Sequence, residues 1–126
     1  PLALRLKHIH NGIAEIIREL QPEAAAFEGL FYATNVQSAL KLAHVRGVSM
    51  VAAAQANIPV FEYSPLEVKS AVTGYGRAEK LQVQQMVRAL LKLESAPEPY
   101  DASDALAVAI CHVHTNRFKN AVAVHL

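Results

Sequence analysis

The sequence predicts an α/β fold, and three observations indicate it. Apolar residues recur every three or four positions in several segments, two short apolar runs are typical of strands, and the predicted order is helix, strand, helix, strand and then three helices. The length of 126 residues and the apolar fraction of 52 % are those of one domain with a single packed core. Because two strands alone do not make a stable parallel sheet, we expect the full sheet to have members that this sequence lacks.

Charge and cysteine content set the broad class of protein. The 12 Lys and Arg against 11 Asp and Glu give a net charge of +1, which argues neither for nor against nucleic acid. No apolar run approaches the roughly 20 residues of a membrane span and no signal peptide is visible, so we expect a cytoplasmic protein without a membrane partner. The single cysteine, Cys111, excludes an intrachain disulfide and is expected in the core. The start at Pro1, directly in helical periodicity, indicates a fragment or a processed chain.

The first two predicted elements are a helix and a strand. Apolar spacing predicts a helix over Leu2–Leu20, and its His8 and His10, two positions apart, are expected to face solvent instead of sharing a metal. The apolar segment from Ala24 to Phe31 predicts a buried strand with Glu28 near its C-terminal end. A buried carboxylate is costly unless it is paired, protonated or bound to a cation, whereas a surface turn would leave Glu28 in water.

Capping signals place the next elements. Thr34 and Gln37 form a T-x-x-Q capping box and predict a helix from near Asn35 through the alanines at 52–54. The run 58–63 predicts a second strand, and Ser-Pro-Leu-Glu at 64–67 combines an N-cap, a first-turn proline and a capping-box glutamate. The short helix that follows ends before the Gly-Tyr-Gly turn at 74–76, where glycine can take positive φ.

Three cations surround this glycine turn. Lys69 precedes it, and Arg77 and Lys80 follow it at the start of a helix whose apolar positions run from Val83 to Leu91. Two glycines and three cations are enough to meet a phosphate backbone, which makes Lys69, Arg77 and Lys80 candidate DNA-binding residues. A glycine turn that only separates two helices is the alternative, and both interpretations stay open.

Asp101 and Asp104 open the last helix, which is rich in alanine. At a spacing of three, both carboxylates project from one face of its first turn, where acids either cap the helix or hold a cation. His112 lies eleven residues beyond Asp101, about 16 Å along the helix axis. That separation is too great for a shared metal, so we expect His112 to be structural.

Five segments, taken together and in order, resemble the RuvC family of bacterial Holliday-junction resolvases. They are 27–31 (FEGLF), 35–42 (NVQSALKL), 60–63 (VFEY), 76–80 (GRAEK) and 101–112 (DASDALAVAICH), within a similarity from about Leu2 to His114. The resemblance implies one nuclease domain over 1–126, with a ribonuclease-H-like mixed sheet flanked by helices but without its first three strands. It also implies resolution of Holliday junctions by paired, metal-dependent nicks during DNA recombination and repair, which leave 5′-phosphate and 3′-hydroxyl ends.

The resemblance places Glu28, Asp101 and Asp104 on catalytic acids that bind the metal. Carboxylates favour hard cations, so we expect Mg²⁺, as two ions, with Mn²⁺ as an alternative. The first catalytic aspartate of the family has no counterpart in this sequence. Two alternatives therefore stand beside a Mg²⁺-dependent crossover junction endodeoxyribonuclease: a non-catalytic junction-binding or dimerisation module, and another ribonuclease-H-like nuclease or transposase.

The same resemblance implies how DNA and partners are bound. Phe31 falls on the aromatic residue that intrudes at the strand-exchange point, and Lys69 and Lys80 match lysines that face DNA. The implied partners are four-way junction DNA, a second copy of the chain that contacts the helix beginning at Asn35, and a branch-migration helicase complex. Basic residues would supply salt-sensitive affinity, and Phe31 would stack on an unpaired base.

Overall fold

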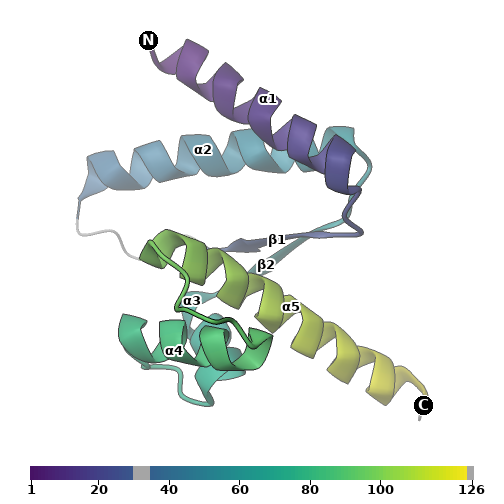
Figure 1. Ribbon diagram of the computed structural model, residues 1–126. Helices are drawn as coiled ribbons and strands as arrows, with labels where there is room; N and C mark the ends of the chain where they lie inside the picture. The colour runs from purple at the N-terminus through teal and green to yellow at the C-terminus, as the bar shows by residue number, and fades with distance from the viewer. Residues whose placement is uncertain (30–34, 125–126) are drawn as a thin grey trace. The chain divides into compact units, whose positions relative to one another are not determined.

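The computed structural model of the chain describes residues 1–29 and 35–124, and it contains the helices and strands that the sequence predicts, in the predicted order. Figure 1 labels them along the chain: α1 (Leu2–Leu20), β1 (Ala25–Glu28), α2 (Val36–Gln55), β2 (Val60–Tyr63), α3 (Pro65–Thr73), α4 (Lys80–Leu91) and α5 (Tyr100–Val124). The chain forms two compact units, Pro1–Glu62 and Tyr63–Leu126. In the described part of the chain, no helix combines the length and the apolarity that crossing a membrane requires.

The first unit places two helices beside a two-stranded sheet. α1 packs on α2, and β1 pairs with β2 in a parallel arrangement (Figure 1). The strand pairing continues beyond the strands, because the backbone N–H of Ala25 donates to the carbonyl of Pro59 at 3.0 Å. Arg46 on α2 forms an ion pair with Glu62 on β2, with 2.9 Å between Nη2 and Oε2.

Small residues form the buried part of α2. Ser49, Ala52 and Ala53 are the residues of this helix that are buried, and the hydroxyl of Ser49 donates to the carbonyl of Val45 at 2.8 Å within the helix. Short side chains allow neighbouring backbone to approach closely at this part of the helix. The expected cap is corrected: Asn35 is the N-cap, and its side chain accepts from the backbone N–H of Gln37 at 2.9 Å. Thr34 lies outside the described residues.

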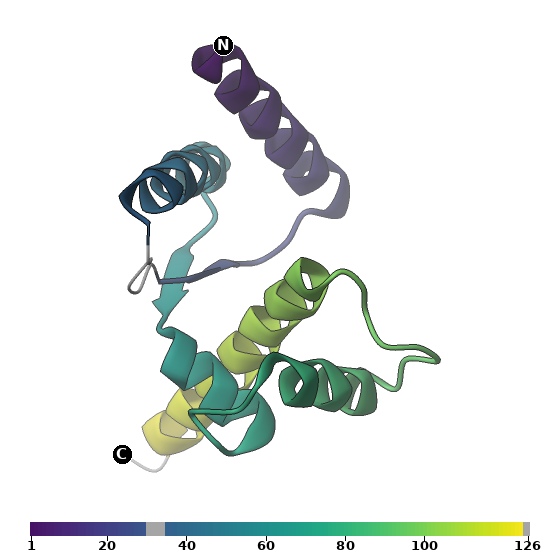
Figure 2. The ribbon, with the colours of Figure 1, turned by 90° about the vertical axis from the view of Figure 1, so that its left-hand side faces the viewer.

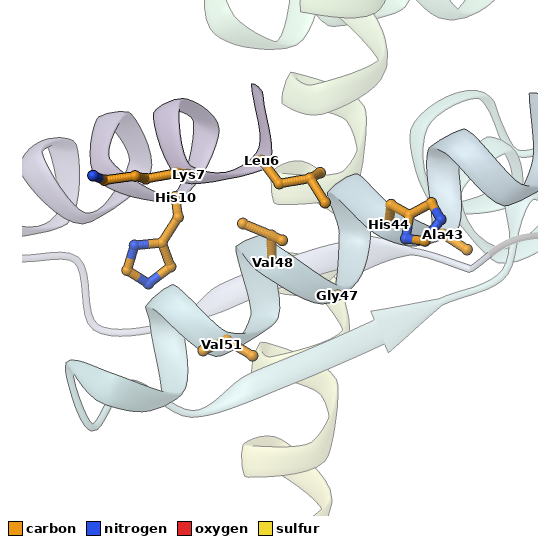
Figure 3. A pocket seen from close by; sticks show the side chains of 8 residues that line it. All are labelled: Leu6, Lys7, His10, Ala43, His44, Gly47, Val48 and Val51. Carbon is orange, nitrogen blue, oxygen red and sulfur yellow. The ribbon is translucent and has the colours of Figure 1, made fainter. Parts of the chain in front are cut away.

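A hollow of about 470 Å³ separates α1 from part of α2, and Figure 3 shows the side chains around it. His10 extends from α1 into this space, and its Nε2 lies 2.8 Å from Oε1 of Gln55 on α2. The prediction of solvent-facing histidines is confirmed for His8, which is exposed, whereas His10 is partly exposed and also contacts Gln55. Helical spacing places His8 and His10 on the polar face of α1. Only His10 lies close enough to α2 to contact Gln55.

The second unit is a three-helix cluster in which α3 and α4 pack on α5 and on each other (Figure 2). Its core consists of apolar side chains from all three helices, from the end of β2 and from the segment between α3 and α4: Tyr63, Val68, Val72, Ala78, Val83, Val87, Ala107, Val108, Ile110 and Cys111. The capping box of α3 is confirmed, because Ser64 accepts from the N–H of Glu67 at 3.1 Å and Glu67 accepts from the N–H of Ser64 at 3.2 Å. This reciprocal pair satisfies two helix-end donors and fixes where α3 begins.

The two glycines of the 74–76 turn have different roles. Gly74 ends α3 with φ at 80°, the left-handed conformation that glycine adopts without a steric penalty. Gly76 instead provides space: a Cβ there would lie 2.9 Å from Cγ of Leu66 and 3.0 Å from Oγ of Ser70. The prediction of positive φ is correct for Gly74, while at Gly76 close packing on α3 explains the glycine.

Candidate functional site

The first turn of α5 carries the acid pair. The helix begins at Tyr100, and the backbone N–H groups of Ala102 and Ser103 donate to the carbonyl of Pro99 at 3.0 and 3.4 Å. Asp101 therefore lies inside the first turn, where the helix dipole favours a carboxylate, and is not the residue that caps the helix. Asp101 is exposed and Asp104 is half-buried.

A stripe of fully buried residues determines this orientation. Ser103, Ala107 and Cys111 recur at a spacing of four, and each is at most 1 % exposed. At about 100° per residue, Asp104 lies about 60° from the centre of the stripe and Asp101 about 120°. The packing face of α5 thus places Asp104 at the edge of the core and Asp101 towards solvent. Among the described residues, the Oγ of Ser103 has no hydrogen-bond partner, so Ser103 acts as a small packing residue.

The environment of Asp104 raises the pKa of its carboxyl group above the usual value. Burial is the largest cause and the neighbouring charge of Asp101 adds to it, while the charges of Lys80 and Lys69 oppose the rise. Lys69 comes from α3 and Lys80 is the first residue of α4. The structure therefore brings two of the three predicted DNA-binding cations to the acid pair, within one helical cluster. The third, Arg77, is exposed in the segment between the two lysines.

Tyr100, which no sequence motif indicated, also belongs to this cluster. The Nζ of Lys80 lies 6.0 Å from the centre of the Tyr100 ring, a cation–π arrangement. Tyr100 is four residues before Asp104 in the same helix, so the two side chains share a helix face. That spacing is the signal in the sequence that would have found it.

Glu28 is the last residue of β1, in the first unit. The predicted strand is confirmed, but its burial is corrected: Ala25, Ala26 and Phe27 are partly covered and Glu28 is exposed. The exposed position removes the desolvation cost that a buried carboxylate would carry. Within residues 1–29 and 35–124, no three His, Cys, Asp or Glu side chains form a group that could hold a metal ion. Phe31, the expected stacking residue, lies outside the described residues.

His112 and Cys111 are packing residues of α5, as the sequence predicted. Nδ1 of His112 is hydrogen-bonded to the hydroxyl of Tyr63 at 2.5 Å, and the two rings are tilted at a centroid distance of 5.8 Å. Cys111 is buried and its thiol donates to the carbonyl of Glu67 at 3.7 Å. Burial raises the pKa of this thiol, which keeps it protonated and unreactive.

Comparisons with known proteins identify the family to which the chain is similar. Residues 1–112 match the family model described as crossover junction endodeoxyribonuclease RuvC. A protein of that name from Koribacter versatilis (strain Ellin345) is 56 % identical over 116 residues, which are 92 % of this chain and 70 % of that protein. Its counterpart from Shewanella pealeana is 56 % identical over 122 residues, which are 97 % of this chain and 70 % of the relative.

Two solved structures resemble the chain closely. The Thermus thermophilus RuvC structure aligns with a TM-score of 0.87 and 38 % identity over 94 % of this chain and 72 % of that one. T. thermophilus RuvC in complex with Holliday junction substrate aligns with a TM-score of 0.90, at the same identity and coverage. The likeness therefore includes a protein that was solved with junction DNA.

Proposed function

The chain belongs to the RuvC family of crossover junction endodeoxyribonucleases, and on that basis we propose that it cleaves Holliday junctions in DNA recombination and repair. The observation that carries the proposal is the cluster of two acids and two lysines in the second unit, where the charges of Lys69 and Lys80 lower the pKa of Asp104 and so favour its ionised form. Acids suit a metal and lysines suit a phosphate, so the cluster has the chemistry of a phosphodiester-cleaving site. The ribonuclease-H-like fold of the structural relatives supports the same conclusion.

RuvC enzymes depend on a metal ion, and the carboxylate oxygens of Asp101 and Asp104 are the type of ligand that hard cations prefer. The charge of Asp101 helps to raise the pKa of the Asp104 carboxyl group, and a divalent cation beside Asp104 would oppose that effect. We propose Mg²⁺, as two ions, with Mn²⁺ as the alternative, because oxygen ligands suit these hard cations. When bound, such ions supply a nucleophilic water and stabilise the leaving oxygen.

Different residues of the chain bind the metal, the DNA backbone and an unpaired base. Asp101 and Asp104 bind the metal, and the family resemblance assigns the same role to Glu28, which is exposed at the end of β1. Lys69, Arg77 and Lys80 hold the DNA backbone near the acids, and Phe31 stacks on an unpaired base at the crossover. The products are a 5′-phosphate and a 3′-hydroxyl.

We further propose one nuclease domain over residues 1–126, since the family match continues from one unit into the other. It would work as a homodimer, because a four-way junction has near two-fold symmetry and two copies present two sites for paired nicks. The apolar residues exposed along α2, among them Val36 (75 %) and Leu40 (56 %), support a contact with the second copy there. A branch-migration helicase complex is the partner that the family implies.

A synthetic four-way junction tests the proposal. With Mg²⁺ we expect paired nicks near the crossover, and with EDTA we expect binding without nicks. Binding in both conditions without nicking would favour the non-catalytic module over the nuclease. Equal cutting of junction and plain duplex would favour a different ribonuclease-H-like nuclease. The names of the relatives, all endonucleases, disfavour the first of these two alternatives.

A further inference from the structure

A cavity of about 560 Å³ lies beside the acid pair and has no role in the function proposed so far. Gln84, Glu98, Pro99 and Tyr100 line it. Its volume is in the range of pockets that take small organic molecules. Tyr100 forms part of the wall and also lies one helical turn from Asp104, so the cavity and the acid pair share the N-terminal end of α5.

The lining matches a nucleobase better than a phosphate. Tyr100 is 42 % exposed and presents an aromatic face, and Pro99 adds an apolar ring. The carboxylate of Glu98 is the charged group of the lining; it would repel a phosphate but can accept a hydrogen bond from the amino group of a base. Gln84 is 7 % exposed and its Nε2 donates to the carbonyl of Pro97 at 3.0 Å, which anchors the wall to the loop before α5.

The cation beside the ring indicates where such a base would come from. The Nζ of Lys80 lies 6.0 Å from the centre of the Tyr100 ring, and its positive charge also favours the ionised form of Asp104. A backbone phosphate held by Lys80 would therefore bring the base of the same or the next nucleotide to Tyr100. We propose that Tyr100 stacks on a nucleobase of the strand that passes the acid pair, with Glu98 at the edge of that base. This subsite rests on the proposed junction-cleaving function and adds a contact to it.

Photo-cross-linking tests the subsite directly. Junctions with 5-iodouracil at single positions around the nicked bond are bound in EDTA, irradiated, and the modified residue is identified by mass spectrometry. We expect one position to cross-link to Tyr100. Tyr100→Phe keeps the aromatic face and should keep the cross-link at residue 100, whereas Tyr100→Ala should abolish it and weaken junction binding roughly 5- to 150-fold. Tyr75→Ala removes a tyrosine that is 57 % exposed but does not line the cavity, and it should leave the Tyr100 cross-link unchanged.

Two comparisons separate base stacking at Tyr100 from a purely structural tyrosine and from a site for free nucleotides. If Tyr100 only held Lys80 in place, Lys80→Gln and Tyr100→Ala would weaken binding equally and no base would cross-link to Tyr100; that result would overturn the inference. Free nucleosides at millimolar concentration should not displace the cross-link if the base is delivered by the junction, and displacement would overturn it in favour of a free-nucleotide site. Junction nicking by the unmodified chain without a Tyr100 cross-link overturns this subsite alone, whereas absence of junction binding overturns the proposed function as well.

Discussion

The hydroxyl of Tyr63 lies 2.5 Å from Nδ1 of His112, which joins the end of β2 to the middle of α5 across 49 residues of sequence. Tyr63 is 7 % exposed, and burial is the main cause that raises the pKa of its hydroxyl, followed by the neighbouring Cys111 and Glu67. The hydroxyl therefore stays protonated at neutral pH and forms a hydrogen bond with the imidazole. Because the same helix carries Asp101 and Asp104, this bond helps to set the position of the acid pair along α5.

Removing the hydroxyl tests this anchor. Tyr63→Phe keeps the ring and its packing but removes this hydrogen bond to His112, so we expect a loss of about 1 kcal/mol in the free energy of unfolding. Urea denaturation followed by circular dichroism measures it. A double-mutant cycle with His112→Ala should give a coupling of similar size, and two additive single losses would show that the contact contributes nothing.

The acid pair predicts a variant that gains stability as it loses activity. Burial and Asp101 raise the pKa of Asp104, so the charged form is unfavourable in the folded state. Asp104→Asn imitates the neutral form and should unfold at an equal or higher temperature at pH 7, while junction nicking is abolished and binding in EDTA remains. Asp101→Asn is the matched control at the exposed acid. A lower melting temperature for Asp104→Asn would contradict the prediction.

The same shift gives two opposite dependences on pH. The folded protein binds a proton at Asp104 more readily than the unfolded chain does, because the pKa of Asp104 is raised above its ordinary value of 3.8. The contribution of Asp104 to the free energy of unfolding is therefore full at pH values below 3.8 and is lost as the pH rises through the raised pKa. Metal binding needs the carboxylate, so nicking at limiting Mg²⁺ should rise over that interval. Nicking rates and urea midpoints across acidic pH measure both. Saturating Mg²⁺ should move the nicking profile to lower pH; an unmoved profile would exclude a metal-bound Asp104.

The two lysines beside the acids should carry part of the affinity for DNA. Lys80→Gln or Lys69→Gln removes one phosphate contact, so junction binding should weaken and the slope of log K against log salt should fall by about one unit. Fluorescence anisotropy in EDTA at several salt concentrations measures the slope. Lys92→Gln, at the opposite end of α4, is the matched control and should leave the slope unchanged. An equal effect of all three substitutions would indicate general charge attraction.

Substitution by alanine should change the free energy of unfolding differently at three glycines. At Gly76 the added Cβ would lie 2.9 Å from Cγ of Leu66, and at Gly74 it would meet a φ of 80°, so both substitutions should lower the free energy of unfolding, by about 1 kcal/mol or more. Gly47→Ala adds a Cβ with no atom within 4 Å in the middle of α2 and should stabilise, by about 0.5–1 kcal/mol. Thermal unfolding of the three variants provides the comparison, and stabilisation at Gly76 would contradict its close packing on α3.

Local signals in the sequence predicted most of the fold. Apolar spacing gave the bounds of α1, and the Ser64–Glu67 capping box gave the start of α3, because each depends on residues within one helical turn. The cap of α2 was predicted wrongly, and the contact of His10 with α2 was not predicted. Asn35 competed with Thr34 for the same role, and the partner of His10, Gln55, is 45 residues away.

The sequence by itself determined the types of residue at the site: two acids three positions apart, three cations around a glycine turn, and the segments that match the RuvC family. Only the tertiary structure decided that Lys69 and Lys80 act on Asp104, that Tyr100 meets Lys80, and that burial makes Asp104 harder to ionise. The reason is physical. Spacing along one helix fixes which side chains share a face, but burial and charge at a carboxyl group depend on the helices that pack against it.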